Sequence, residues 1–153
     1  MIIVAAMTRD RVIGKNNDLP WNIPEEMEHF RSITKGGVAL MGRRTFDSIG
    51  QKPLPGRPTI VISKSLEERT DVDVCRTVEQ GIEKAKSYNL PIYVMGGSYI
   101  YNETLPLADR MYLSYIKKDY DGDTFFPEFS EDDWEVEKRE DHEEFEFVVY
   151  KRK

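Results

Sequence analysis

Several short stretches of the chain are apolar at nearly every position, and this pattern constrains the fold more than any other feature. Ile2–Met7 and Val38–Met41 are two examples, and neither alternates apolar with polar residues. A strand that is apolar on both faces has to be covered on both faces, as the strands of parallel sheets are. We therefore expect a sheet that lies between two covering layers.

The segments between these stretches are amphipathic and have the length of helices. Further strands are expected at Thr59–Ser63, Val72–Cys75, Ile92–Met95 and Arg110–Ile116, and helices at Pro24–Thr34, Arg44–Ile49, Val78–Ser87 and Ser98–Leu105. Two last segments, Trp134–Arg139 and Glu144–Lys151, alternate apolar and polar residues, which is typical of an antiparallel pair at a sheet edge. This order predicts a layered α/β fold with a mostly parallel sheet, in a single domain over residues 1–153.

The composition excludes several classes of protein. One cysteine and two histidines among 153 residues leave no disulfide framework, and we expect neither a cysteine-rich nor a histidine-based metal centre. No stretch approaches the ~20 apolar residues of a membrane span, and the apolar start is too short for a signal peptide. A reducing cytoplasm is the expected compartment. No surplus apolar stripe is visible, so we expect a monomer.

The charge is uneven along the chain. A net charge of −6 argues against a nucleic-acid partner. Half of the 28 acidic residues, 14, lie between Asp119 and Glu146 with only two basic residues, and we interpret this run as a solvated face. The rest of the chain is close to neutral or mildly basic, so an anionic ligand would bind there.

Glu26 stands out on the first predicted helix. With about 100° per residue, Ile23, Met27, Phe30 and Ile33 fall in one apolar arc, and Glu26 falls inside that arc. A carboxylate on a core-facing side is unfavourable unless a partner hydrogen-bonds it. Glu26 therefore has either a structural partner or a ligand pocket before it, and desolvation would raise its pKa.

Glycines and basic residues follow several predicted strands. Met95-Gly96-Gly97-Ser98 joins a strand to a helix and could bring backbone amides against a phosphate, although a tight turn gives the same pattern. Met41-Gly42-Arg43-Arg44-Thr45 has the same form, and Ser63-Lys64 and Arg76 also follow strands. Ligands of open α/β sheets bind beyond the carboxyl ends of the strands, so these groups jointly indicate a polyanionic ligand. The long irregular segment Thr8–Ile23 is either a binding loop or a plain connection.

Taken together, these segments resemble dihydrofolate reductases over nearly the whole chain. The motifs that carry the resemblance keep the family's order and spacing. They are Ala5-Ala6, Arg11-Val12-Ile13-Gly14, Leu19-Pro20-Trp21-Asn22-Ile23-Pro24, Met41-Gly42-Arg43-Arg44-Thr45-Phe46, Ser48-Ile49-Gly50, Pro53-Leu54-Pro55-Gly56-Arg57, Met95-Gly96-Gly97-Ser98, Gly122-Asp123-Thr124 and Phe126-Pro127.

The resemblance implies a three-layer fold: a mostly parallel, mixed sheet of eight strands with helices on both faces and a C-terminal antiparallel hairpin. It implies reduction of 7,8-dihydrofolate to tetrahydrofolate for one-carbon metabolism, with NADPH as cofactor. A hydride would pass to pterin C6, and Glu26 would promote protonation of N5. Antifolates such as methotrexate or trimethoprim would be further ligands, and neither nucleic acid nor membrane is expected as a partner.

The resemblance also implies roles for single residues. Catalysis would involve Trp21, beside an active-site water, and Ser114, which stands in place of a threonine that supports the acid and the pterin. The substrate pocket would be formed by Val4, Ala5, Met27, Phe30, Ile49 and Leu54, and Arg57 would clamp the glutamate α-carboxylate of the substrate.

The implied cofactor positions fall into groups. The 2′-phosphate side would be Arg43, Ser63, Lys64 and Arg76; the phosphate-binding turns would be Gly96, Gly97, Ser98 and Thr45; and Tyr101 would lie near the nicotinamide. The remaining positions are Ala6, Ile13, Gly14, Leu19, Gly42, Arg44, Met95, Tyr99, Ile100 and Asp123.

Two other functions fit these residues less well. An NADPH-dependent reductase of another heterocycle would have no glutamate tail for Arg57 to clamp. A non-catalytic folate- or nucleotide-binding module would not need Glu26, the cofactor turns and Arg57 together.

Overall fold

A computed structural model of the chain describes residues 1–16 and 19–153. The strands of its main sheet are β1 (Ile2–Thr8), β3 (Val38–Gly42), β4 (Thr59–Ile62), β5 (Asp73–Cys75), β6 (Ile92–Val94), β7 (Arg110–Ile116), β9 (Trp134–Asp141) and β10 (Phe145–Arg152). They lie in the order β5-β4-β3-β6-β1-β7-β10-β9. β10 is antiparallel to both β7 and β9, and the other neighbours are parallel. The mixed, mostly parallel sheet with a C-terminal hairpin is thus confirmed.

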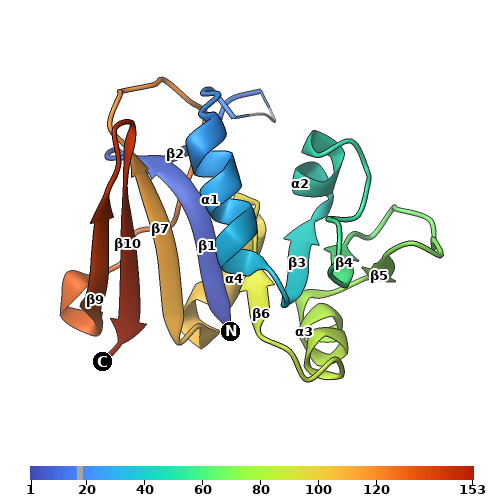
Figure 1. Ribbon diagram of the computed structural model, residues 1–153. Helices are drawn as coiled ribbons and strands as arrows, with labels where there is room; N and C mark the ends of the chain where they lie inside the picture. The colour runs from blue at the N-terminus through green and yellow to red at the C-terminus, as the bar shows by residue number, and fades with distance from the viewer. Residues whose placement is uncertain (17–18) are drawn as a thin grey trace.

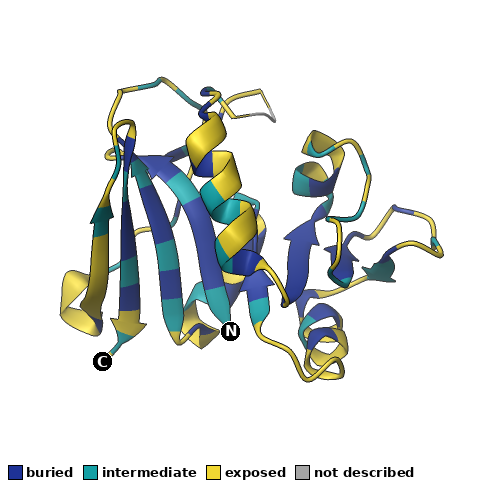
Figure 2. Cartoon of the chain, in the orientation of Figure 1, coloured by how far each residue is buried: buried dark blue, intermediate teal, exposed yellow. Residues whose placement is uncertain are grey.

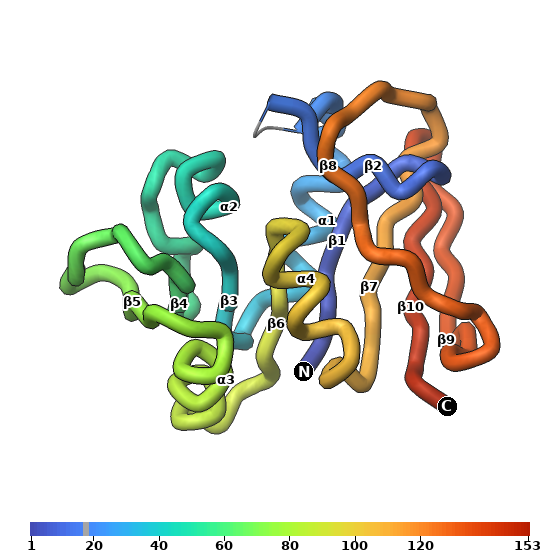
Figure 3. Tube along the Cα trace, turned by 180° about the vertical axis from the view of Figure 1, so that it is seen from behind, coloured from blue at the N-terminus to red at the C-terminus, as the bar shows by residue number. Residues whose placement is uncertain are grey.

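Helices cover both faces of this sheet, as predicted. They are α1 (Pro24–Thr34), α2 (Arg43–Ser48), α3 (Val78–Lys86) and α4 (Ser98–Thr104), with short 3₁₀ turns at η1 (Leu105–Leu107) and η2 (Glu131–Asp133). Figure 1 shows α1 in front of the sheet, and the view from behind in Figure 3 brings α3 and α4 to the front. Among the described residues, no helix is long and apolar enough to cross a bilayer.

The central strands send alternate side chains into two cores. Ile3 of β1 packs with Ile100 of α4 on one face, whereas its neighbour Val4 belongs to a cluster with Phe46 of α2 and Phe30 of α1 on the other. This alternation follows from the two-residue period of a strand. In Figure 2 the central strands are accordingly buried along most of their length, while β9 at the sheet edge and the outer faces of the helices are largely exposed.

Helix α1 begins and ends where the sequence predicts. Pro24 occupies the first helical position, where its missing N–H leaves no carbonyl unpaired, and Glu25 and Glu26 lie in the positively polarised first turn. After the helix, Gly36 adopts a φ of 83°, a left-handed conformation that favours glycine, and the chain turns into β3.

The long segment before α1 contains a strand that the sequence did not reveal. β2 (Val12–Gly14) pairs antiparallel with β8 (Thr124–Phe125) in a separate two-stranded sheet. Both strands lie among charged residues and glycines and show neither a continuous apolar run nor an alternating pattern, so the sequence does not mark them as strands. The other described residues between β1 and Pro24 belong to no helix or further strand. Residues 17 and 18 lie outside the described part of the chain.

Two side chains are covered differently from expectation. His29 falls outside the apolar arc of α1, which predicts an exposed side chain, but it is only 15% exposed because the rings of Phe145 and Phe147 pack against it. Cys75 closes the predicted strand Val72–Cys75, which predicts a buried thiol, but the residue is partly exposed at the end of β5. A helical wheel or a strand pattern describes one element alone. It does not show that another element covers His29, or that β5 is an edge strand, which leaves Cys75 partly exposed.

Candidate active site

A cleft of about 1400 Å³ opens at one edge of the main sheet. Because β1, β3, β4, β5 and β6 are mutually parallel, their carboxyl ends meet at this edge. Residues at or just after the ends of β3, β4, β5 and β6 line the cleft. The middle of β1 (Val4, Ala5 and Ala6), the inner side of α1 and the first residues of α2 and α4 complete the lining. Ligands of open α/β sheets bind at such an edge.

Glu26 contributes a buried carboxyl group to this cleft. The residue is 5% exposed, whereas Glu25 and Glu28 on the same helix are exposed, as the helical wheel predicts. Loss of hydration on burial raises the pKa of Glu26 from 4.5 to about 7. A carboxyl group with this pKa can hold a proton near neutral pH and exchange it with a ligand.

Apolar side chains surround the carboxyl group. Val4, Phe30, Ile49 and Leu54 line the cleft, and Met27 lines it while remaining 41% exposed towards the opening. They come from β1, from α1 and from the segment after α2, so three separate elements form one apolar wall. Such a wall suits a flat aromatic ligand whose polar groups are few and directed.

Arg57 lies beside this wall rather than in it. Its guanidinium donates to Thr34 Oγ1, to the Arg31 carbonyl at 3.4 Å and, from Nε, to the Pro55 carbonyl at 3.4 Å. Arg31 and Pro55 both line the cleft, so Arg57 is anchored immediately behind its rim. Burial lowers the pKa of Arg57 from its usual value.

Positive charge collects at the other end of the cleft, where β3, β4 and β5 end. The Arg76 guanidinium donates to the carbonyls of Ser63 at 3.0 Å and Leu66 at 2.6 Å. Arg43 donates to Ser65 Oγ at 3.0 Å, and Lys64 also lines this end. These cations follow separate strands, and the parallel sheet brings them together.

The Gly96-Gly97 turn brings bare backbone to the centre of the cleft. The peptide bond between the two glycines is cis, and Gly96 adopts a φ of 98°. A Cβ atom on Gly97 would point toward Thr45 Oγ1, 3.7 Å away, with no closer neighbour. Gly97 is the N-cap of α4 and Ser98 its first residue, and the helix has no side-chain cap among the described residues. Gly97 and Thr45 both line the cleft, so the turn brings the starts of α4 and α2 together there.

Tyr101 lies under the same turn. Its hydroxyl donates to the Val4 carbonyl at 2.7 Å, and burial raises the pKa of the phenol far above its usual value. The ring is buried and lines the cleft next to β1. A neutral phenol held in this way is a rigid part of the cleft floor.

The structure brings most of the predicted site residues to the cleft. The residues that line it are Val4, Ala5, Ala6, Ile13, Gly14, Leu19, Glu26, Met27, Phe30, Gly42, Arg43, Arg44, Thr45, Ile49, Leu54, Ser63, Lys64, Arg76, Met95, Gly97, Ser98, Tyr99, Ile100 and Tyr101. Five predicted residues are not in its lining: Trp21, Arg57, Gly96, Ser114 and Asp123.

Three of these five are held away from the lining by identifiable contacts. Trp21 is buried against Tyr120, with ring centroids 5.7 Å apart, and its indole nitrogen has no partner among the described residues. Ser114 is buried on β7, in register with Ala6 of β1. Asp123 lies at β2, where its carboxylate accepts the Asn16 N–H at 3.1 Å.

The cleft also contains residues that were not predicted. They are Arg31, Met41, Ser48, Lys52, Pro53, Pro55, Ile62, Thr77, Val78, Glu79, Glu103 and Thr124. Arg31 falls outside the apolar arc on the helical wheel, but it follows Met27, at the edge of that arc, by four residues and so lies next to it. Thr124 lies at the cleft because β8 pairs with β2, and the sequence does not indicate this pairing.

Comparisons with known proteins agree with this geometry. The family model described as dihydrofolate reductase matches residues 1–152. The chain is 39% identical over 135 residues to dihydrofolate reductase of Haemophilus influenzae, covering 88% of this chain and 83% of that protein. It is 35% identical over 159 residues to the Bacillus subtilis protein of the same name, covering 98% and 93%.

Among solved structures, the chain is similar to dihydrofolate reductase from Enterococcus faecalis complexed with NADP(H) and RAB-propyl. The TM-score is 0.89 at 31% sequence identity, and the match covers 99% of this chain and 95% of that one. The match of sequence over nearly the whole length and the match of fold point to the same family. The chain therefore belongs to the dihydrofolate reductase family, whose members are NADPH-dependent oxidoreductases.

Proposed function

We propose that this protein reduces 7,8-dihydrofolate to 5,6,7,8-tetrahydrofolate with NADPH and so supplies tetrahydrofolate to one-carbon metabolism. The observation that carries the proposal is the carboxyl group of Glu26, the one buried carboxyl group among the described residues, in an apolar part of the cleft. The reaction adds a hydride to pterin C6 and a proton to N5, which saturates the bond between them. A proton source beside the pterin is therefore required, and Glu26 is suited to provide it.

The other end of the cleft fits NADPH. Arg43, Lys64 and Arg76 form a cationic set that matches a 2′-phosphate, the group that distinguishes NADPH from NADH. The backbone of Gly97, which carries no side chain, and the hydroxyl of Thr45 both line the cleft and suit the pyrophosphate. When bound, NADPH supplies the hydride from nicotinamide C4, next to Tyr101.

Glu26 would both bind the pterin ring and promote its protonation. Its carboxyl oxygens are suited to hydrogen-bond the pterin amino group and ring N–H, which fixes the ring in the apolar wall. With a pKa of about 7 the group is partly protonated near neutral pH, so it can promote protonation of N5 through water. Trp21, whose buried N–H is a free donor among the described residues, and Ser114 would support that water and the acid.

The remaining groups position the substrate. Met27, Phe30, Ile49 and Leu54 would enclose the pterin and benzoyl rings and exclude water from the reacting atoms. Arg57, with its planar array of donors, would bind the α-carboxylate of the glutamate tail at the rim. Antifolates such as methotrexate or trimethoprim would compete for the same pocket.

Replacement of Glu26 tests the proposal. Glu26→Gln keeps the size of the side chain but cannot release a proton, so hydride transfer to dihydrofolate should slow by about 10²–10⁴-fold at pH 7. Wild-type hydride transfer should also fall as the pH rises through about 7, because Glu26 loses its proton there.

Glu28→Gln is the matched control, since Glu28 is an exposed carboxylate on the same helix. Its rate and pH profile should match the wild type in stopped-flow measurements of NADPH consumption. A Glu26→Gln variant with wild-type rates across this pH range would refute the assigned role of Glu26.

A further inference from the structure

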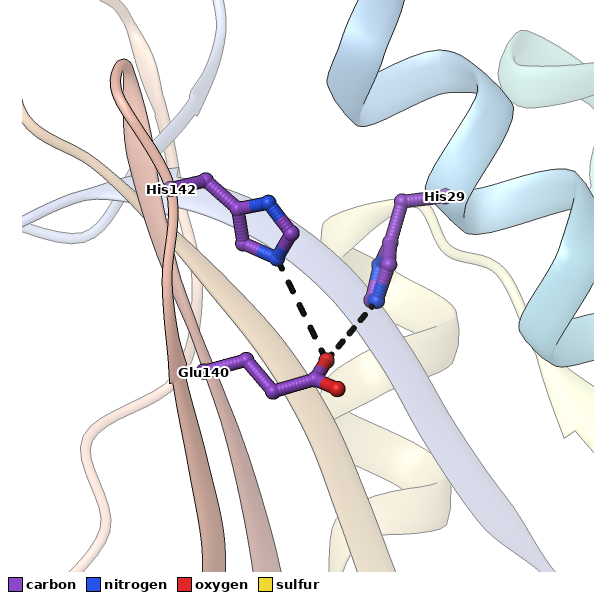
Figure 4. Close-up of side chains that lie close together, drawn as sticks. All are labelled: His29, Glu140 and His142. Carbon is purple, nitrogen blue, oxygen red and sulfur yellow. Dashed lines mark hydrogen bonds and ion pairs between the residues drawn. The ribbon is translucent and has the colours of Figure 1, made fainter.

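Two histidines and a glutamate meet on the outer flank of α1, away from the residues that line the cleft. His29 comes from α1, Glu140 from the end of β9, and His142 from the turn that joins β9 to β10 (Figure 4). His29 Nε2 lies 3.3 Å from Glu140 Oε2, and His142 Nε2 lies 4.0 Å from the same oxygen. The three atoms all lie within 4.8 Å of one another. We call these three residues the flank cluster.

A second carboxylate sets the tautomer of His142. Glu25 Oε1 lies 2.7 Å from His142 Nδ1, so Nδ1 carries the proton that this hydrogen bond requires. The lone pair of a neutral His142 is then on Nε2. That nitrogen is buried, has no hydrogen-bond partner among the described residues and faces the Glu140 carboxylate (Figure 4). A metal-bound imidazole commonly donates its other ring N–H to a carboxylate, which fixes the tautomer and the orientation of the ring.

The spacing of the flank cluster suits a small divalent metal ion. Zinc binds histidine nitrogen and carboxylate oxygen at about 2.0–2.2 Å, which puts tetrahedral ligand atoms about 3.3 Å apart. The separations of 3.3 and 4.0 Å need only small side-chain rotations to reach this value. The rings are already supported, because His142 stacks on Phe145 and His29 contacts Phe147 edge-on, each with centroids 4.3 Å apart.

Only one of the two Glu140 carboxylate oxygens is positioned to bind a metal. Lys138 Nζ contacts Glu140 Oε1 at 3.1 Å, while Oε2 faces both imidazoles. Glu25 adds a second negative charge at the rim of the flank cluster. Two imidazoles and one carboxylate form a ligand set that zinc and related transition metals favour, whereas calcium and magnesium prefer oxygen ligands alone.

We propose that His29, Glu140 and His142 bind one divalent transition-metal ion of the zinc type, with water completing the coordination and Glu25 positioning His142. The sequence predicted no histidine-based centre, because two histidines alone are too few; the third ligand is Glu140, which the fold of the hairpin supplies. The bound ion would link α1, the helix that carries Glu26, to the β9–β10 hairpin. Zinc should therefore stabilise the folded chain.

The test uses the full chain, purified without a histidine tag and freed of metal with a chelator. Zinc is titrated by calorimetry, and the imidazole proton resonances are followed by NMR. Because the chain has only two histidines, both resonances can be assigned with one variant. We expect one equivalent of zinc to bind, both resonances to shift with it, and the Tm to rise.

Substitutions assign the ligands. His29→Gln, His142→Gln and Glu140→Gln should each weaken zinc binding by more than about tenfold, and Glu25→Ala by about tenfold. Glu143→Gln, which removes an exposed carboxylate next to His142, should bind zinc as the wild type does. Cys75→Ser should also bind normally, which excludes capture by the only thiol.

Two results would overturn the proposal. One is the absence of a zinc-dependent shift of the two histidine resonances in the wild type, a readout that does not depend on the folding of any variant. The other is undiminished zinc binding in His142→Gln with a native circular dichroism spectrum. Loss of zinc binding in Cys75→Ser but not in the histidine and glutamate variants would show that the thiol binds the metal, and it would equally contradict the flank cluster.

Discussion

At the scale of single residues, the burial of Glu26 makes the free energy of unfolding depend on pH. Its pKa is raised from 4.5 to about 7 by desolvation, so the folded state holds a proton that the unfolded state releases between these pH values. The stabilisation from the protonated form is complete below pH 4.5 and is lost as the pH rises through 7. A shift of this size corresponds to roughly 3 kcal/mol.

Glu26→Gln removes this dependence, because the amide does not titrate. Relative to the variant, the wild-type free energy of unfolding should fall by up to about 3 kcal/mol between pH 4.5 and pH 8. Urea unfolding at several pH values measures the difference. Glu28→Gln should follow the wild type, and parallel curves for wild type and Glu26→Gln would show that the carboxyl group is not desolvated.

Arg57 offers a test of substrate orientation at the same scale. Charge-assisted hydrogen bonds contribute about 1.5–3 kcal/mol, so Arg57→Leu should raise the KM for dihydrofolate by roughly 10–100-fold with little change in kcat. The same variant should use dihydropteroate, which lacks the glutamate tail, as well as the wild type does.

Lys35→Ala is the control, because Lys35 is an exposed cation just after α1. Steady-state kinetics with both substrates separate the roles. An equal loss of activity toward dihydropteroate in Arg57→Leu would mean that Arg57 supports the pocket rather than binding the tail.

At the scale of elements, the proposed site for the 2′-phosphate of NADPH lies at the ends of β3, β4 and β5. Lys64 follows β4 and lines the cationic end of the cleft. Lys64→Ala should raise the KM for NADPH by about tenfold or more and leave the KM for NADH unchanged, because only NADPH carries the 2′-phosphate. Lys64→Arg should retain most of the preference.

Lys86→Ala, at the exposed end of α3, is the matched control for lost positive charge and should behave as the wild type. The ratio of kcat/KM values for the two cofactors is the readout. An unchanged ratio in Lys64→Ala would show that Lys64 does not bind the 2′-phosphate.

Elements with a clear apolar run or period were predictable from the sequence, and those without one were not. The bounds of α1 and β7 were predicted to the residue, since eleven- and seven-residue elements carry a clear pattern. β2 and β8 were missed because their pairing is set by the tertiary fold. Glu26 could be identified from the helical period alone, which is a local property.

The flank cluster marks the limit of that local analysis. His29 lies outside the apolar arc of α1, and only the folding of the β9–β10 hairpin against that side of the helix covers it. Trp21, Ser114 and Asp123 illustrate the opposite limit. The family resemblance named them, but their side chains lie behind or beside the cleft, so contact with the cleft does not support their roles.

At the scale of the whole molecule, one cleft joins two chemically different halves. The half beside α1 is largely apolar and contains the buried acid Glu26, and the half at the ends of β3, β4 and β5 is cationic. The acidic run from Asp119 to Glu146 includes β9, and only Thr124 of that run lines the cleft. This arrangement suits a flat heterocycle in one half and a polyphosphate in the other. The monomeric state and the single domain over residues 1–153 stay predictions.

The most direct test of this account is the absorbance of NADPH when dihydrofolate is added to the purified protein. We predict loss of the NADPH signal that requires dihydrofolate, that methotrexate blocks, and that slows sharply in Glu26→Gln but not in Glu28→Gln. Binding of NADPH by the folded protein without any consumption would contradict the account and indicate a binding module. Consumption that requires a different heterocycle and resists methotrexate would contradict it as well and indicate another reductase on the same fold.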